Sequence, residues 1–133
     1  MHKILVGELE LMLTNERQIL NMGGPWIADV SVGTDFVSNN CILDNFVHNK
    51  TFNLLFFVKF NKVSKYYWYF SINFYNIDTK TVFEFDRVFD MVHIGDFRTK
   101  NELEIYPAFH AQFKDTQQIF NLDQEEFHET SQL

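Results

Sequence analysis

The chain has little of what builds disulfide-stapled, linker-rich or membrane-spanning proteins. Among its 133 residues are one cysteine, two prolines and five glycines, and no apolar run approaches the roughly 20 residues that span a bilayer. A lone cysteine excludes an intramolecular disulfide, so apolar packing must hold the fold together. No linker, repeat or change in composition marks a boundary, and we expect a single domain over residues 1–133.

Motifs for catalysis, metals and cofactors are also missing. The five histidines, at positions 2, 48, 93, 110 and 128, do not fall into a metal-binding spacing. Gly23-Gly24 is followed by Pro25-Trp26 instead of the lysine of a phosphate loop, and no serine stands in a nucleophile elbow. We therefore expect no enzyme activity, no metal and no cofactor. An active site that only the fold assembles stays open as an alternative.

The single cysteine, Cys41, lies in an apolar stretch beside Ile42 and Leu43, which indicates a small buried residue. A nucleophilic cysteine requires a nearby base, and the nearest basic candidate, His48, lies seven residues away. The start of the chain becomes acidic at Glu8 before the apolar segment of a signal peptide can form. We therefore expect a cytoplasmic protein that does not bind a membrane.

The chain is instead rich in apolar and aromatic residues, and its negative charge is unevenly placed. Hydrophobic residues make up 46% of the sequence and sixteen residues are phenylalanine, so a packed core is expected. Residues 1–80 hold seven acids and seven bases, whereas residues 81–133 hold eleven acids and four bases and account for the whole net charge of −7. The acidic half lacks the clustered lysine and arginine that bind nucleic acids, and it favours a basic protein partner.

Alternation of apolar and polar residues with a period of two predicts strands along most of the chain. Asn53–Phe60 is apolar on both faces, which predicts an interior strand that is covered on both sides. Residues 14–17 predict a turn, and Gly23-Gly24-Pro25 predicts a break. The predicted strands are Ile4–Leu13, Gln18–Met22, Trp26–Val32, Phe36–Val47 with an interruption near residues 38–40, Asn53–Phe60, Tyr66–Tyr75 and Val82–Val88.

The last two of these strands are expected to pair as a hairpin, because one register keeps both of their faces in phase. In that register Phe74 lies opposite Phe83, and Ile72 lies opposite Phe85, on the apolar side. On the other side Asn73 lies opposite Glu84, and Ser71 lies opposite Asp86.

Toward the end of the chain the pattern becomes helical. Pro107 suits a first helical turn, and Phe109, Phe113 and Phe120 recur at the spacing of an apolar helical stripe. Asn121–Phe127 predicts a second helix with an Asn cap and acids in its first turn. The predicted fold class is α+β and mainly β: a bent antiparallel sheet or open barrel of about six to eight strands with one or two C-terminal helices.

A candidate recognition face lies on the tyrosine side of the predicted hairpin. Tyrosine provides contact area at low entropic cost, and neighbouring carboxylates suit a protein surface better than a nucleic acid. The alternative is that a C-terminal helix covers this side, which would place the tyrosines in the core. The expected partner-binding residues are Tyr67, Tyr69, Asn73, Tyr75, Glu84 and Asp86.

Short segments distributed from Gly23 onwards add a likeness to known proteins. They are Gly23-Gly24-Pro25-Trp26 with Asp29, Asp44-Asn45-Phe46, Phe56-Phe57-Val58-Lys59, Ser71-Ile72-Asn73-Phe74, and Glu104-Ile105-Tyr106 with Phe109-His110. With them, this small acidic domain resembles the immunity proteins that neutralise bacterial polymorphic toxins. The resemblance implies a cytoplasmic inhibitor that occludes a cognate toxin, and it assigns no individual binding residue.

We expect this inhibitor to be a monomer or a homodimer that binds a toxin or another basic protein. The alternative is a small-molecule or lipid-binding carrier with a barrel-like cavity, which the two-sided apolar strand Asn53–Phe60 would suit.

Overall fold

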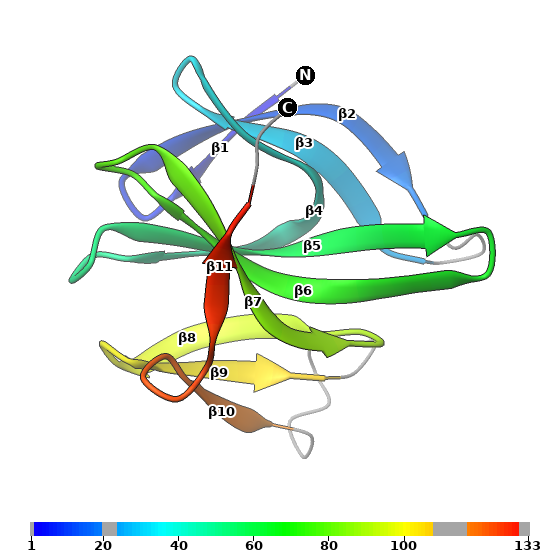
Figure 1. Ribbon diagram of the computed structural model, residues 1–133. Helices are drawn as coiled ribbons and strands as arrows, with labels where there is room; N and C mark the ends of the chain where they lie inside the picture. Colours follow the sequence, from blue (N-terminus) through cyan, green and yellow to red (C-terminus); the bar gives the residue numbers. More distant parts are fainter. Residues whose placement is uncertain (1, 20–23, 108–116, 131–133) are drawn as a thin grey trace.

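The computed structural model describes residues 2–19, 24–107 and 117–130, and there the chain is built from antiparallel strands. Eleven strands form two sheets (Figure 1). These ranges contain no helix, and therefore none long and apolar enough to cross a membrane. The strands are β1 (His2–Val6), β2 (Leu9–Gln18), β3 (Trp26–Val32), β4 (Asp35–Asn49), β5 (Leu54–Ser64), β6 (Tyr67–Asn76), β7 (Thr81–Phe89), β8 (His93–Thr99), β9 (Glu102–Tyr106), β10 (Gln118–Asn121) and β11 (Phe127–Glu129).

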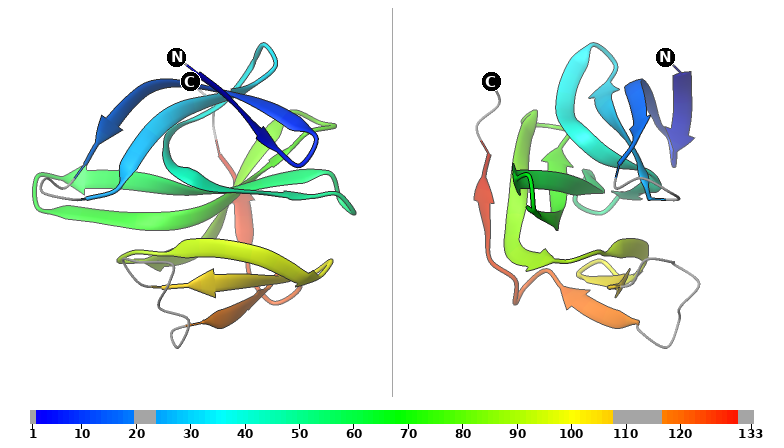
Figure 2. Two further views of the ribbon diagram at one scale, coloured as in Figure 1. Left: turned by 180° about the vertical axis from the view of Figure 1, so that it is seen from behind. Right: turned by 90° about the vertical axis from the view of Figure 1, so that its right-hand side faces the viewer.

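Eight of the strands form one bent sheet in the order β1-β2-β3-β4-β5-β6-β7-β11. From β1 to β7 each strand pairs with the next one in the sequence, whereas β11 pairs with β7 only after the chain has formed the second sheet. That sheet is small and has the order β10-β9-β8. Figure 1 shows β1–β3 above the central strands β4–β7 and the small sheet below them, and Figure 2 shows β11 as an outer strand beside β7.

The central strands β5 and β6 bury apolar side chains on both faces. On one face Phe56 and Phe74 belong to a core that includes Phe120 of the small sheet. On the other face Phe57 and Tyr75 belong to a second core, which strands β1–β4 complete. The predicted interior strand is confirmed, because β5 lies between β4 and β6 and contributes to both cores.

Two buried asparagines of β4 join the sheets by hydrogen bonds. The side-chain amide of Asn45 donates to the carbonyl of Ile94 at 2.9 Å, and its Oδ1 accepts from the amide of Ile94 at 3.0 Å. The side chain of Asn49 donates to the carbonyl of Lys100 at 2.9 Å. Because buried polar groups require partners, these bonds hold the small sheet against β4 at defined positions.

The predicted hairpin is present as β6 and β7, but its register holds only near the turn. Phe74 pairs with Phe83 and Asn73 with Glu84, as expected, and the rings of Phe74 and Phe83 stack with centroids 4.9 Å apart. The other two predicted pairs are wrong, because the register shifts between Asn73 and Ser71 and Ser71 pairs with Val88. Such a bulge inserts extra residues into one strand and bends it, which a strict alternation pattern does not reveal.

The prediction of one strand over Ile4–Leu13 is wrong, because the chain turns at Gly7 and Glu8 between β1 and β2. Gly7 has a φ of +61°, a conformation that a residue without a Cβ adopts at no steric cost. Because Val6 pairs with Leu9, the buried face changes from the even positions Ile4 and Val6 to the odd positions Leu9 and Leu11 across the turn, while the exposed Leu5 imitates an unbroken odd series. The pattern therefore hid a hairpin.

The turn predicted at residues 14–17 is instead a bulge inside β2, where Asn15 has a φ of +55°. β2 ends at Gln18, and residues 20–22 of the predicted return strand lie outside the described residues. The interruption expected near residues 38–40 coincides with a φ of +58° at Asn40 within the continuous strand β4. Asparagine tolerates this left-handed conformation better than most residues.

The predicted C-terminal helices are wrong within the described residues, so the fold class there is all-β. Phe120 lies in β10, and Phe127 lies in β11. The side chain of Asn121 does accept a hydrogen bond from the Asp123 amide at 2.9 Å, as a helix cap would, but the chain forms one turn and then enters β11. Packing of Phe127 on aromatic rings of the large sheet outweighs the local helical preference. Phe109 and Phe113 lie outside the described residues.

Substitution Phe74→Ala should lower the free energy of unfolding by about 3–5 kcal/mol, because it leaves a cavity among packed rings. Phe74 is buried and lies within 5.5 Å, centroid to centroid, of Phe56, Phe83, Phe85 and Phe127. Denaturant unfolding monitored by circular dichroism measures the loss. Phe36→Ala is the control, because its side chain is half exposed and the change there should be below about 1 kcal/mol. Equal losses would contradict the assigned core.

Candidate partner-binding face

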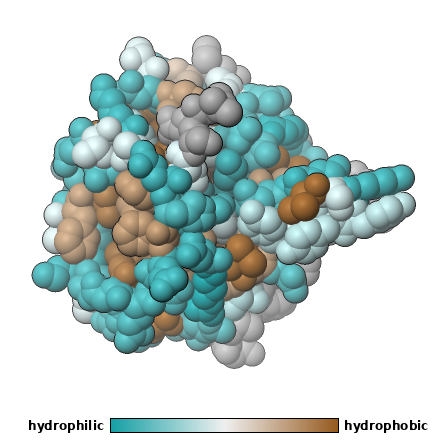
Figure 3. Space-filling view, viewed as in Figure 1, coloured by the Kyte–Doolittle hydropathy of each residue, from teal (hydrophilic) through white to brown (hydrophobic). Residues whose placement is uncertain are grey.

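Strands β5 and β6 extend beyond their neighbours as a two-stranded ribbon, residues 60–69. On the β5 side the pairing with β4 reaches only Lys59, and on the β6 side the pairing with β7 begins only at Phe70. Between these limits the two strands pair with each other and with no third strand of the described chain. The ribbon projects from the body at the right of Figures 1 and 3. Within the described residues its outer backbone edges are therefore left without a neighbouring strand.

The tip of the ribbon is aromatic and basic. Tyr66 is 83% exposed, Val63 62% and Tyr67 54%, which is high for large side chains on one short segment. Lys62 and Lys65 are the charged residues of the ribbon, and the Lys65 ammonium lies 5.4 Å from the centre of the Tyr66 ring. The ring of Tyr67 lies 6.2 Å from that of Tyr69. Exposed tyrosines in contact with each other are typical of recognition surfaces.

Two carboxylates of β7, Glu84 and Asp86, lie beside the part of β6 that leads into the ribbon, and a histidine of β11 bridges them. His128 Nδ1 lies 2.7 Å from Asp86 Oδ1, and His128 Nε2 lies 3.4 Å from Glu84 Oε1. Glu84 is also close enough to Tyr69 for its negative charge to act on the tyrosine hydroxyl. Burial, reinforced by this charge, raises the pKa of Tyr69. We call Tyr67, Tyr69, Glu84, Asp86 and His128 the tyrosine–carboxylate face.

A buried polar relay behind this face fixes the position of Glu84. Ser71 Oγ lies 2.9 Å from Glu84 Oε2 and 2.8 Å from Asn73 Oδ1, so its single hydrogen can be donated to either oxygen. The Ser71 oxygen accepts from the side chain of Asn61 at 2.9 Å. Ser71 is fully buried, and these contacts engage it with no histidine. The relay therefore positions a carboxylate and does not build a nucleophile.

The structure divides the six residues that the sequence suggested for partner binding. Tyr67 and Asp86 are exposed, and Tyr69 and Glu84 are partly exposed. Asn73 and Tyr75 are buried and therefore lie outside any contact surface. Tyr75 is covered by the core that strands β1–β4 complete, and not by a C-terminal helix as the alternative supposed; burial raises its pKa.

Sequence reasoning missed His128, because Asn121–Phe127 predicted a helix there. The alternation of Phe127, His128 and Glu129 was the available signal for a strand, but three residues are too short to establish a period.

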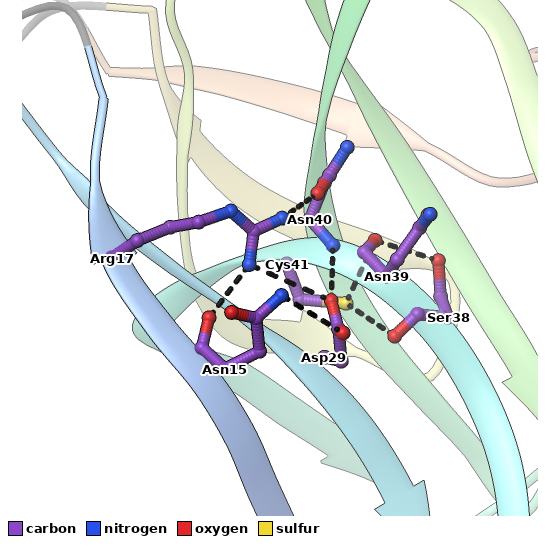
Figure 4. A network of polar contacts seen from close by, with 7 residues as sticks. All are labelled: Asn15, Arg17, Asp29, Ser38, Asn39, Asn40 and Cys41. Carbon is purple, nitrogen blue, oxygen red and sulfur yellow. Dashed lines mark hydrogen bonds and ion pairs between the residues drawn. The ribbon is translucent and has the colours of Figure 1, made fainter.

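A second polar cluster, formed by residues between Asn15 and Cys41, joins β2, β3 and β4 (Figure 4). Arg17 donates to the carbonyl of Asn15 at 2.6 Å and to the side chain of Asn40, and its guanidinium lies 3.7 Å from Asp29. Asp29 in turn accepts from the backbone amide of Asn40 at 3.4 Å. Since Asn15 and Asn40 have positive φ, the cluster braces two irregular points of neighbouring strands.

Cys41 lies beneath this cluster and is fully buried, as the sequence indicated. Its Sγ lies 3.7 Å from the carbonyl oxygens of Ser38 and Asn39 (Figure 4). Burial raises the pKa of the thiol to about 12, so the thiolate needed for nucleophilic attack is scarce at neutral pH. Among the described residues no group of three or more His, Cys, Asp or Glu side chains could hold a metal ion.

Cys41 should remain unreactive toward a thiol reagent such as DTNB in the folded chain near pH 8, because it is buried and protonated. Unfolding in guanidinium exposes the thiol and restores an ordinary pKa, so one thiol per chain should then react. The released chromophore, measured with and without denaturant, gives both rates. Equal rates would show that Cys41 is accessible in the native fold.

Comparison with known proteins found no matching family model, no matching curated protein and no matching solved structure.

Proposed function

We propose that this chain is a cytoplasmic protein that binds another protein and inhibits it, as the immunity proteins it resembles block their toxins. The observation that carries the proposal is the projecting ribbon, which exposes Tyr66 and Tyr67 at its tip and holds Tyr69 within reach of the Glu84 charge on β7. Tyrosine is among the residues that contribute most to the binding energy of protein interfaces. A soluble domain exposes large aromatic side chains together where a partner covers them.

The charge around the tyrosine–carboxylate face supports a basic surface on the partner. β11 and the loop before it hold three further acids, namely Glu125, Glu126 and Glu129, of which Glu125 is paired with Arg87 at 3.6 Å. Opposite charges across an interface accelerate association and reject wrong partners more than they add affinity. The lysines at the ribbon tip suit acidic groups on the same partner, so the two patches together would fix its orientation.

The shape of the ribbon supports inhibition by occlusion. A two-stranded element that projects beyond the sheet can enter a concave site on a partner, and its unpaired backbone edges can bond to the partner's main chain. The core formed by Phe60 and Phe70, whose ring centroids lie 5.4 Å apart, anchors the base of the ribbon. A rigid base reduces the entropy that the ribbon loses on binding.

The carrier alternative was suggested by the apolar residues on both faces of Asn53–Phe60. Packing accounts for them: the ring of Phe56 lies 5.1 Å from that of Phe97, and Phe57 and Leu55 belong to the second core. We therefore propose protein binding alone.

The proposal is tested by expressing each gene that neighbours this one in the source genome, alone and together with this chain, in a bacterial host. A neighbouring product that stops growth alone but not with this chain, and that co-purifies with it, is the expected result. If every neighbouring product is harmless and none co-purifies, inhibition of a genetically linked toxin is ruled out.

Asp86→Lys and Tyr67→Ala should each weaken binding of that partner at least about fivefold. Tyr67→Ala should leave the melting temperature nearly unchanged because its side chain is exposed, whereas Asp86→Lys also removes the contact with His128 and should lower the melting temperature slightly. Titration calorimetry and thermal melting measure the two effects. Glu8→Lys is the control for charge, since it makes the same change on an exposed residue at the β1–β2 turn, at the opposite end of the large sheet. Equal weakening by Asp86→Lys and Glu8→Lys would show that only net charge matters.

A further inference from the structure

We propose that the outer edge of β7 is a strand-addition site, which the chain's own β11 occupies here in place of a segment of the partner. The segment would be extended, with an aromatic residue followed by arginine or lysine. This inference rests on the proposed function, since the segment belongs to the inhibited protein, and it specifies how that protein is recognised.

The present occupant covers only the first part of the edge, from Val82 to Asp86. β11 has three residues, all exposed, and pairs only with Phe83–Phe85 of the nine-residue strand β7. Two further backbone bonds flank it, from the Asp86 amide to the Glu126 carbonyl and from the Thr130 amide to the Val82 carbonyl, both at 2.9 Å. Beyond Asp86 no strand of the described chain pairs with this edge of β7. A longer strand can therefore form more of the ladder than β11 does.

The first side-chain subsite accepts an aromatic ring. The ring of Phe127 lies 5.3 Å from that of Phe74, 5.7 Å from Phe83 and 5.6 Å from Phe85, with edges directed at faces. Such edge-to-face contacts favour an aromatic occupant over an aliphatic one. Phe127 nevertheless stays 49% exposed, so part of the ring lies outside the contact. The large sheet thus forms the subsite, and the ring of Phe127 fills only part of it.

The second subsite accepts a positive charge. The imidazole of His128 lies between two carboxylates, Asp86 at 2.7 Å and Glu84 at 3.4 Å. A neutral imidazole has one N–H and can donate to only one of them, whereas a guanidinium has five N–H donors and keeps its charge. Glu84 is already held in place by Ser71, so little reorganisation is needed to pair it with a cation. The subsite therefore selects arginine or lysine over the histidine that fills it.

The charge of this subsite also argues for a partner segment over β11 of a second copy. An exchanged β11 would bring the same histidine and the same acids, Glu126 and Glu129, and would gain nothing over the strand it replaces. A basic residue from a different protein would satisfy both carboxylates at once.

The experiment uses the full chain and a fluorescent peptide of residues 124–130 that carries His128→Arg. Its binding is measured by fluorescence anisotropy. Two control peptides are measured in the same way: the unchanged peptide, which keeps His128, and a peptide that carries Phe127→Ala together with His128→Arg. The Arg peptide should bind at least about fivefold more tightly than either.

A disulfide lock tests whether β11 must leave. Thr130 follows Glu129 and donates its backbone N–H to the Val82 carbonyl at 2.9 Å, so Val82→Cys with Thr130→Cys places two cysteines on facing residues outside both subsites, and the native Cys41 is buried. The reduced form should bind the Arg peptide, and the oxidised form of the same protein should bind it at least about tenfold more weakly. Thermal melts of both forms check that the comparison is between folded states.

A second variant keeps the test independent of the lock. His128→Arg in the chain itself should strengthen the resident strand, so the chain should melt at a higher temperature and bind the Arg peptide less tightly. Equal binding by the reduced and oxidised forms, or by all three peptides, overturns the proposal. So does exchange into a dimer, detected by light scattering, with no peptide bound. A toxin that still co-purifies with the oxidised form would overturn strand addition and leave the proposed inhibitory function standing.

Discussion

The architecture depends on the burial of both faces of strand β5. A strand with Phe56 on one side and Phe57 on the other is stable only when each side meets an apolar layer. One large sheet cannot supply both layers while flat, so its first half bends over one face of the central strands and a separate small sheet covers the other. The phenylalanines divide between these two interfaces, and the buried asparagines of β4 set the position of the small sheet.

The same central strands pass from core to surface along their length, and the candidate face lies where they do so. Near Tyr75 the side of β6 that faces the bent half is apolar and buried. Toward the middle it becomes polar but remains buried, with Ser71 and Asn73 bonded to each other and to Glu84. Only the Tyr67 end reaches solvent. The relay thus connects a rigid interior with the carboxylate that the surface presents, which keeps the geometry of that carboxylate defined.

Much of the sheet was predictable because alternation with a period of two is a local signal that survives over ten residues of β6. The turn at Gly7 was not predictable, because the exposed Leu5 imitates the buried series that begins at Leu9. The bulge near Ser71 was not predictable either, because it shifts the register by a number of residues that only the partner strand reveals. Four residues of the candidate face followed from the pattern. The burial of Tyr75 depends on the bend of β1–β4, and the placement of His128 depends on a strand recruited by distant rings, so neither could be read from neighbouring residues.

The residues proposed for contact, at the tip of the ribbon, differ from the residues that stabilise the fold. Tyr66 and Val63 at its tip are exposed and belong to neither core, so substitutions there alter the free energy of unfolding by only about 0.5 kcal/mol. If the ribbon binds a protein as we propose, mutation of the tip would change the partner while the fold is left intact. Substitutions in the two cores would destabilise the fold, whereas the tip of the ribbon tolerates changes in its side chains.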